Sequence, residues 1–270
     1  MAILSYVERG HYGRHQVAVF IHGIMGNKKN WLIFINNWLA SFPGWTALVF
    51  DLPNHGDSPK HMSPYTVGSC AQELVSSLKQ LGIEPQVVIG HSFGAKVALL
   101  TADQLTSVEQ IWLLDSSPGA VVAKPLDHQE LSALELIDLL ASLAWPQPSR
   151  KALVAALLNY GVSNNIALWM TTNLSDSPSG LILTFIPAEL KAMLIDFFKL
   201  DLWPLITKLA PHKKIHLVAA EYGQRLNQAD QDMLADKTDK RGFFHTLKHA
   251  GHFLHADKPA DLIKLMADHW

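Results

Sequence analysis

The chain has 270 residues, a length typical of one or two domains; 49% of the residues are hydrophobic and only 17% are charged, which excludes a disordered chain. Lys and Arg number 22 against 24 Asp and Glu, so the formal net charge is −2 and no basic excess favours nucleic acid or an anionic membrane surface. The single cysteine, Cys70, excludes an intramolecular disulfide framework and a cysteine-rich zinc site.

The amino-terminal segment does not have the pattern of a secretory signal. Glu8 interrupts its apolar residues, and neither a long apolar region nor a small-residue cleavage site follows. The longest uncharged stretch, residues 152–175, contains asparagines and a glycine that do not suit a membrane span. We therefore expect a cytoplasmic protein without a membrane span.

Short apolar runs recur along the chain and predict buried parallel strands, because a strand covered on both faces has a continuous apolar sequence. These runs are residues 17–21, 47–50, 87–89, 111–114, 215–219 and 243–247. Helical spacing lies between or after them, at residues 30–41, 69–81, 95–104 and 259–267. The alternation predicts an α/β fold with a mostly parallel central sheet flanked by helices.

The pattern changes between residues 118 and 211. Segments with helical spacing follow one another there without an intervening strand signal, at residues 131–145, 150–160, 166–174 and 188–210. Because the strand pattern resumes afterwards, we interpret residues 118–211 as a helical insertion. The core is then formed by residues 1–117 and 212–270.

The pattern G-x-S-x-G at residues 90–94 lies between a predicted strand and a predicted helix. In that context the chain makes a sharp, strained turn that presents the serine at the carboxyl end of the sheet. The flanking glycines lack Cβ atoms, so the strand and the helix can approach closely. We predict Ser92 as a nucleophile; a tight turn with a capping serine is the alternative.

A serine hydroxyl needs a nearby base to act as a nucleophile. His252 is the best candidate, because it lies in a loop between the last predicted strand and the last predicted helix. A metal site formed by His249, His252 and His255 is the alternative. Their spacing matches neither H-E-x-x-H nor a Cys/His zinc site, so we predict no metal.

Four segments occur in order in the two halves of the predicted core: residues 22–26 (HGIMG), 51–59 (DLPNHGDSP), 90–96 (GHSFGAK) and 251–259 (GHFLHADKP). Together they resemble the α/β-hydrolase superfamily, in particular its esterase branch with an N-H-G-x-S turn and a G-H-S-x-G-[GA]-K nucleophile elbow. The resemblance implies a helical cap at residues 118–211. It also implies hydrolysis of a small-molecule carboxylic ester or thioester through an acyl-enzyme, without a cofactor.

The third member of a catalytic triad is a carboxylate that orients the histidine. Most members of the family carry it after the strand that follows the cap, but Gly223 occupies that place here. Asp115, at the end of an earlier strand, is our prediction, and the esterase branch likewise places an acid there. Glu221 and Asp230 are the alternatives. We expect an Asp115 carboxylate oxygen within roughly 2.6–3.2 Å of His252 Nδ1.

Two backbone N–H groups are expected to bind the oxyanion that forms during attack on an ester. One is that of Phe93, the residue after the nucleophile. By resemblance, Ile24 supplies the other; the alternative is that residues 22–23 form only a turn after the strand. We expect Lys96 to be a structural residue paired with a carboxylate.

Two other functions remain open from the sequence. A lyase of the menaquinone-pathway type shares the fold and the triad, and would need cationic groups to hold an acidic substrate. The candidates for such groups between residues 118 and 211 are Lys124, Arg150, Lys151, Lys191, Lys199 and Lys208. A non-catalytic ligand-binding module is the second alternative.

Overall fold

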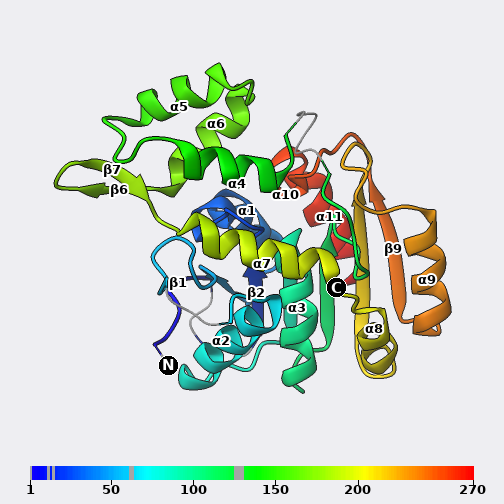
Figure 1. Cartoon of the computed structure of the whole chain (residues 1–270). Helices are drawn as coiled ribbons and strands as arrows, with labels where there is room; N and C mark the ends of the chain where they lie inside the picture. The colour runs from blue at the N-terminus through cyan, green and yellow to red at the C-terminus, as the bar shows by residue number, and fades with distance from the viewer. Residues whose placement is uncertain (1, 11–12, 14–15, 61–63, 125–130) are drawn as a thin grey trace.

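A computed structural model describes residues 2–10, 13, 16–60, 64–124 and 131–270. In this part of the chain, seven strands form a sheet in the order β1-β3-β2-β4-β5-β8-β9 (Figure 1). β1 pairs antiparallel with β3, and the remaining neighbours are parallel. The predicted α/β fold with a mostly parallel sheet is confirmed. The strands are β1 (Tyr6–Gly10), β2 (Val17–Ile21), β3 (Thr46–Phe50), β4 (Val87–His91), β5 (Gln110–Leu114), β8 (Lys214–Ala220) and β9 (Gly242–Leu247).

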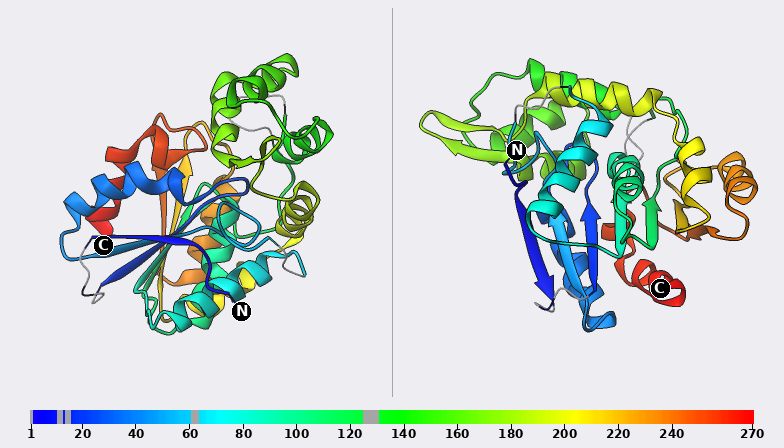
Figure 2. Two further views of the ribbon diagram at one scale, coloured as in Figure 1. Left: turned by 90° about the vertical axis from the view of Figure 1, so that its left-hand side faces the viewer. Right: turned by 90° about the horizontal axis from the view of Figure 1, so that it is seen from below.

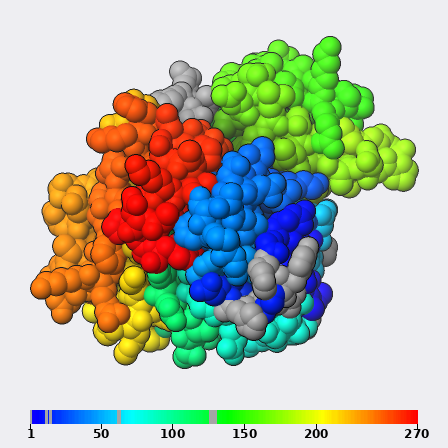
Figure 3. All heavy atoms as spheres, turned by 180° about the vertical axis from the view of Figure 1, so that it is seen from behind, coloured from blue at the N-terminus to red at the C-terminus, as the bar shows by residue number. Residues whose placement is uncertain are grey.

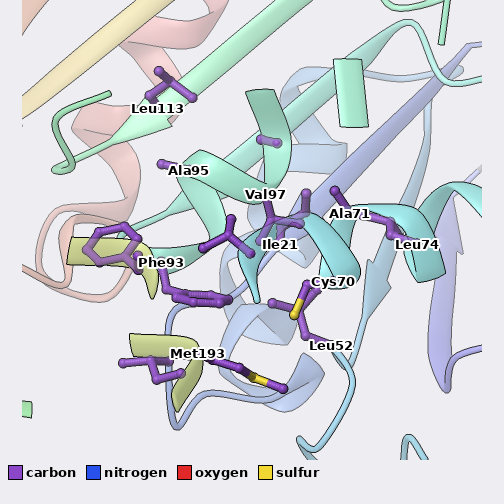
Figure 4. Close-up of a cluster of buried hydrophobic side chains, with 14 of the residues drawn as sticks. Ile21, Leu52, Cys70, Ala71, Leu74, Phe93, Ala95, Val97, Leu113 and Met193 are labelled. Carbon is purple, nitrogen blue, oxygen red and sulfur yellow. The ribbon is translucent and has the colours of Figure 1, made fainter. Parts of the chain in front are cut away.

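Helices cover both faces of the sheet, which explains why its inner strands are apolar throughout (Figure 2). In β2, Val19 packs into one core layer and Phe20 into the opposite one. The first layer includes α2 (Val67–Gln80) and α3 (Phe93–Gln104), and Figure 4 shows part of it. The second includes α1 (Leu32–Ser41) and α11 (Pro259–His269), which lie side by side in Figure 3.

Some elements have no counterpart in the predictions. β1 forms one edge of the sheet and carries two charged residues, so it lacks the continuous apolar pattern of a buried strand. Helix α9 (Gln228–Thr238) is polar on most of its surface and was not predicted either. A short helix, α10 (Leu254–Asp257), follows the loop that carries His252. The turn η1 (Lys28–Trp31), capped by Asn27, extends α1 toward the amino terminus.

The segment between β5 and β8 is mostly helical, but it also contains a hairpin. The prediction that no strand intervenes is wrong: β6 (Leu174–Ser177) and β7 (Gly180–Leu183) pair around a turn that contains Pro178. Each strand has only four residues, so neither gives a clear alternating pattern. The helices are α4 (Ala133–Ser142), α5 (Arg150–Asn159), α6 (Asn164–Met170), α7 (Pro187–Lys199) and α8 (Trp203–Leu209), with the short turn η2 (Thr171–Asn173) after α6.

The prediction of a single helical segment at residues 188–210 is also wrong. Two helices occupy this range, because α7 ends at Lys199 and α8 begins at Trp203. Pro204 stands in the first turn of α8, where its missing N–H costs no helical hydrogen bond. Asn54 fixes the start of α7: its side chain exchanges two hydrogen bonds with the Ile186 backbone, at 2.9 and 3.1 Å. Among the described residues, no helix combines the length and apolar character needed to cross a membrane.

Candidate active site

Ser92 lies at a strained turn between β4 and α3. Its φ of 53° and ψ of −117° place it outside the usual regions for a residue with a side chain. The neighbouring glycines are required by space: a Cβ on Gly90 would lie 2.1 Å from the Gly94 carbonyl oxygen, and one on Gly94 would lie 2.5 Å from the His22 oxygen. The turn therefore presents the hydroxyl of Ser92 at the carboxyl end of β4, as its sequence pattern predicts.

Asp115 and His252 meet directly, although they are 137 positions apart in the sequence. His252 Nδ1 lies 2.8 Å from Asp115 Oδ2, and both side chains are buried. The carboxylate accepts a hydrogen bond, so Nδ1 carries the proton and Nε2 of the neutral ring remains an acceptor. The second carboxylate oxygen accepts the Ala220 N–H at 3.1 Å, which fixes the orientation of the acid.

Gly223 has no side chain, and this leaves room for the Asp115 carboxylate. A Cβ at Gly223 would lie 2.2 Å from Asp115 Oδ2 and 2.8 Å from its Cγ. These separations are well below van der Waals contact, so an acid at Gly223 and the observed Asp115 conformation exclude each other. The glycine at the usual position of the family acid is thus the structural complement of the carboxylate on β5.

Glu221 and Asp230, the alternative acids, bind other partners. Glu221 accepts the backbone N–H of His249 at 2.7 Å, and this bond lowers the pKa of the Glu221 carboxyl group. Asp230 accepts the hydroxyl of Ser117 at 2.5 Å and caps the start of α9 through the Asn227 N–H. The structure brings Asp115, and neither of these residues, to His252.

Two buried histidines shape the loop that follows β2. The Nε2 atom of His22 accepts the Leu52 N–H at 3.0 Å, and that of His55 accepts the Met25 N–H at 3.2 Å. Their Nδ1–H groups donate to the carbonyls of Gly23 and Pro53. Both rings are therefore neutral, and burial lowers the pKa of His55 to about 3. The sequence does not reveal these partners, because each ring accepts from a backbone group 30 positions away in the chain.

The predicted oxyanion donors are the N–H groups of Ile24, in the loop after β2, and of Phe93, at the start of α3. Met25 N–H is taken by His55 and Gly26 N–H by the Gly23 carbonyl, at 3.0 Å. Within the described residues, the Ile24 N–H makes no such bond. Phe93 is the first residue of α3, so its N–H has no acceptor within the helix. Both N–H groups are thus available to a ligand, and their catalytic role stays a prediction.

A cavity of about 740 Å³ joins Ser92, His252 and Asp115 to the segment between β5 and β8. Most of its wall is apolar, as is usual for small-molecule sites. Phe185 and Trp203, two other large apolar residues between β5 and β8, pack in the core and do not line the cavity. Prominent apolar side chains of the wall are Ile24, Met25, Ile166, Trp169, Leu194, Phe197, Phe198 and Phe253.

In the part of the chain that the structure describes, two cationic side chains line the cavity, Lys124 and Arg225. Lys124 Nζ donates to the Gln224 carbonyl, and Arg225 donates to the Lys124 carbonyl at 3.4 Å, so they tie two loops together. Of the six cations considered for an acidic substrate, Lys124 is the one that lines the described wall. Lys191 and Lys208 instead pair with Asp138 and Asp103 on the surface.

Lys96 pairs with no carboxylate among the described residues, so that prediction is wrong. It is fully buried, and its Nζ donates to three backbone carbonyls.

The three histidines of the alternative metal site point to different partners. His249 faces Tyr222, His252 faces Asp115, and His255 stacks on Trp31 with 4.2 Å between ring centroids. No group of ligands that could hold a metal occurs among the described residues.

Buried histidines also occur away from the cavity. The ring of His216 stacks on Trp112, with 3.9 Å between centroids, and its Nδ1 lies 3.1 Å from His245 Nε2. Burial, assisted by the neighbouring histidines, lowers the pKa of His216 to about 3 and that of His245 to about 4. These side chains are neutral in the folded protein near neutral pH.

We expect the free energy of unfolding to decrease as the pH falls below 6.5. Histidines of the unfolded chain take up protons near pH 6.5, whereas His55, His216 and His245 stay neutral until about pH 3–4 in the folded protein. The unfolded state therefore binds more protons in this window, and the stabilisation present above pH 6.5 is lost on acidification. Each such group contributes a slope of at most about 1.4 kcal/mol per pH unit, a limit approached only well below pH 6.5. Solvent screening makes the contribution of the partly exposed His245 smaller.

Urea midpoints measured from pH 7 to pH 5 test this expectation. His216→Phe, which keeps an aromatic ring between Trp112 and Phe243, should give a shallower pH dependence than the wild type. Stability that does not change across this range would contradict the assignment of neutral buried rings.

Comparisons with known proteins agree with the fold. A model described as "Alpha/beta hydrolase family" matches residues 18–265. Among curated proteins, the mouse (Mus musculus) sn-1-specific diacylglycerol lipase ABHD11 is 28% identical over 91% of this chain and 78% of its own length. Its zebrafish (Danio rerio) counterpart is 31% identical over 58% of this chain and 49% of its own length.

Solved structures share the fold across nearly the whole chain. A marine microorganism esterase superposes with a TM-score of 0.83 at 20% identity and covers 99% of both chains. The thioesterase domain from the curacin biosynthetic pathway has a TM-score of 0.70 at 18% identity, covering 97% of this chain and 94% of that one. At these identities the likeness concerns the fold.

Proposed function

Because the chain belongs to the alpha/beta hydrolase family, we propose that it hydrolyses a carboxylic ester or thioester, with Ser92 as nucleophile, His252 as base and Asp115 as acid. The observation that carries the proposal is the 2.8 Å contact between His252 Nδ1 and Asp115 Oδ2, in the same cavity as a serine at a strained turn. Ester-cleaving relatives such as the mouse diacylglycerol lipase support it.

In the proposed reaction, Ser92 Oγ attacks the carbonyl carbon while His252 Nε2 takes its proton. Asp115 stabilises the resulting imidazolium, and the N–H groups of Ile24 and Phe93 bind the negative oxygen. His252 then protonates the departing alcohol or thiol, which leaves the acyl group on Ser92. Next, His252 removes a proton from a water molecule, which attacks the acyl-enzyme. The bond between the acyl carbon and Ser92 Oγ then breaks, and His252 returns the proton to Oγ as the carboxylic acid leaves.

We also propose that residues 118–211 act as the cap of this site. Ala133 of α4, Ile166 of α6 and Leu194 of α7 contribute to the cavity wall, which supports the assignment. Their apolar side chains favour an acyl group over a charged substrate. The cap would then exclude water from the acyl chain and leave the ester carbonyl beside Ser92.

The position of the acid provides a test of this function. Asp115→Asn should reduce turnover of p-nitrophenyl acetate by roughly a hundredfold or more, because asparagine removes the charge that stabilises imidazolium and favours the wrong histidine tautomer. Glu221→Gln and Asp230→Asn should have mild effects, because their carboxylates contact other groups. Steady-state kinetics of the three variants measure this difference.

Moving the acid sharpens the test, because Gly223 faces the Asp115 carboxylate. The double variant Asp115→Gly with Gly223→Asp should be roughly tenfold or more as active as Asp115→Gly alone. Gly223→Asp alone should be impaired, because its Cβ collides with the native acid. Full activity in Asp115→Asn, or strong loss in Glu221→Gln alone, would contradict the assignment.

A further inference from the structure

Lys96 uses all the donors of its side chain on backbone carbonyls. It lies four positions after Ser92 in α3 and is fully buried. Its Nζ donates to the carbonyls of Gly119, Phe197 and Leu200, at 2.7, 2.8 and 2.6 Å. An ammonium group has three N–H donors, so the charged form satisfies each carbonyl with one of them. This arrangement requires the protonated lysine.

The acceptors of Lys96 belong to two segments outside α3. Gly119 follows β5, while Phe197 and Leu200 stand at the carboxyl end of α7. The last carbonyls of a helix have no partner within the helix, and a cation near them is favourable. Lys96 therefore joins the helix that follows the nucleophile to the end of α7 and to the loop after Asp115.

The same lysine fixes part of the cavity wall. Its Nζ stands 4.5 Å from the centre of the Phe197 ring, and this ring lies 5.7 Å from that of Phe93. Phe93 on α3 and Met193 on α7 belong to one apolar cluster (Figure 4). Phe197 and its neighbour Phe198 both line the cavity. Lys96 thus contacts the backbone and the ring of Phe197 directly, and the Phe198 ring packs against that of Phe197 with 5.6 Å between their centroids.

We propose that Lys96 is a positioning residue that holds the Phe197–Phe198 wall against the nucleophile helix and thereby favours longer acyl chains over short ones. This inference rests on the proposed ester hydrolysis. A long acyl chain depends on apolar contact with the wall, whereas an acetyl group reaches little beyond the carbonyl. Displacement of the wall therefore weakens turnover of the long ester more than that of the short one.

The test compares p-nitrophenyl hexanoate with p-nitrophenyl acetate in the wild type and in Lys96→Met. We expect the ratio of their kcat/KM values to fall roughly tenfold in the variant, mainly through a higher KM for the hexanoate. Two backbone bonds still tie the same segments, Val121 N–H to Phe198 O and Leu202 N–H to Pro118 O, both at 2.9 Å. Because these bonds remain, we expect Lys96→Met to fold. The wall should nevertheless shift, because its bonds to α3 through Lys96 are lost.

Lys213 provides a matched control. It is also a buried lysine that donates to two backbone carbonyls, those of Leu105 and Val108. Neither of these acceptor residues lines the cavity, whereas Phe197 does. Lys213→Met should lower stability and leave the ester ratio within about twofold of the wild type. If the ratio of the two kcat/KM values also fell tenfold in Lys213→Met, the inference would be overturned, because general destabilisation would then explain the change.

The pH dependence of the ratio gives a second readout. Burial lowers the pKa of Lys96 to about 8, while Asp201 and Asp196 raise it. Because both esters share the same serine and histidine, their ratio is insensitive to those groups. We expect the wild-type ratio to fall between pH 7 and pH 9 and the low ratio of Lys96→Met to stay constant. A flat wild-type ratio, or an equal fall in both proteins, would overturn the inference.

Wild-type turnover tests the proposed ester hydrolysis, and the ester ratio of Lys96→Met tests the role of Lys96. If the wild type hydrolyses neither ester, the proposed function is wrong, and this inference falls with it. If the wild type hydrolyses both esters and Lys96→Met keeps its ratio within twofold, the role of Lys96 alone is wrong.

Discussion

Ser92→Ala is expected to lower hydrolysis of p-nitrophenyl acetate by roughly 10⁴- to 10⁶-fold, while the protein remains folded. The variant removes the oxygen to which the acyl group bonds, and the oxyanion donors alone then supply little rate enhancement. Ser92 is partly exposed to the cavity, and alanine fits the same strained backbone. Steady-state kinetics together with circular dichroism measure activity and folding separately.

Ser116→Ala is the matched control, because Ser116 also lines the cavity but does not lie at the strained turn. The turnover of Ser116→Ala should be lower than that of the wild type by less than roughly tenfold. A folded Ser92→Ala variant with turnover near that of the wild type would exclude the serine mechanism. Absence of turnover in the wild type across acyl esters and thioesters would instead favour a ligand-binding module of this fold.

His252→Ala is expected to lose activity to a similar degree. The variant removes the group that accepts the serine proton and leaves Asp115 buried without its partner. Removal of the base in a serine hydrolase costs about as much as removal of the nucleophile, because the two act as one unit. Thermal denaturation should accompany the kinetics, since the buried acid also destabilises the folded state.

His249→Ala is the control for this variant. Its side chain is largely exposed and lies 3.0 Å from the Tyr222 hydroxyl, so its loss should change turnover by less than about threefold. His255 is a poorer control, because it is buried against Trp31. Strong inhibition by a chelator, reversed by zinc, would favour the metal alternative over a base at His252.

The parallel strands were predictable because burial on both faces leaves a clear trace in the sequence. Residues 17–21 are apolar throughout, and in the structure they pack into both core layers. The β6–β7 hairpin was missed because each strand has only four residues and because β6 consists mostly of polar residues. Patterns of hydrophobicity report burial, so elements at an edge or on the surface give weaker signals.

The chemical site was predictable only where a motif defines local geometry. The turn around Ser92 follows from glycines that stand within a few positions of it. The fit between Gly223 and Asp115 involves residues 108 positions apart and depends on how β5 and β8 pair. The carbonyl acceptors of Lys96 are backbone atoms, which carry no sequence signature. Long-range contacts of this kind emerge only from the fold.

The most direct test of the account is to identify the residue that bears the covalent intermediate. The active protein is treated with a fluorophosphonate, digested, and analysed by peptide mass spectrometry. We expect one adduct on Ser92, complete loss of ester turnover as the adduct forms, and no adduct in Ser92→Ala. An adduct on another residue that tracks the loss of activity, or full turnover in protein quantitatively modified at Ser92, would contradict this expectation.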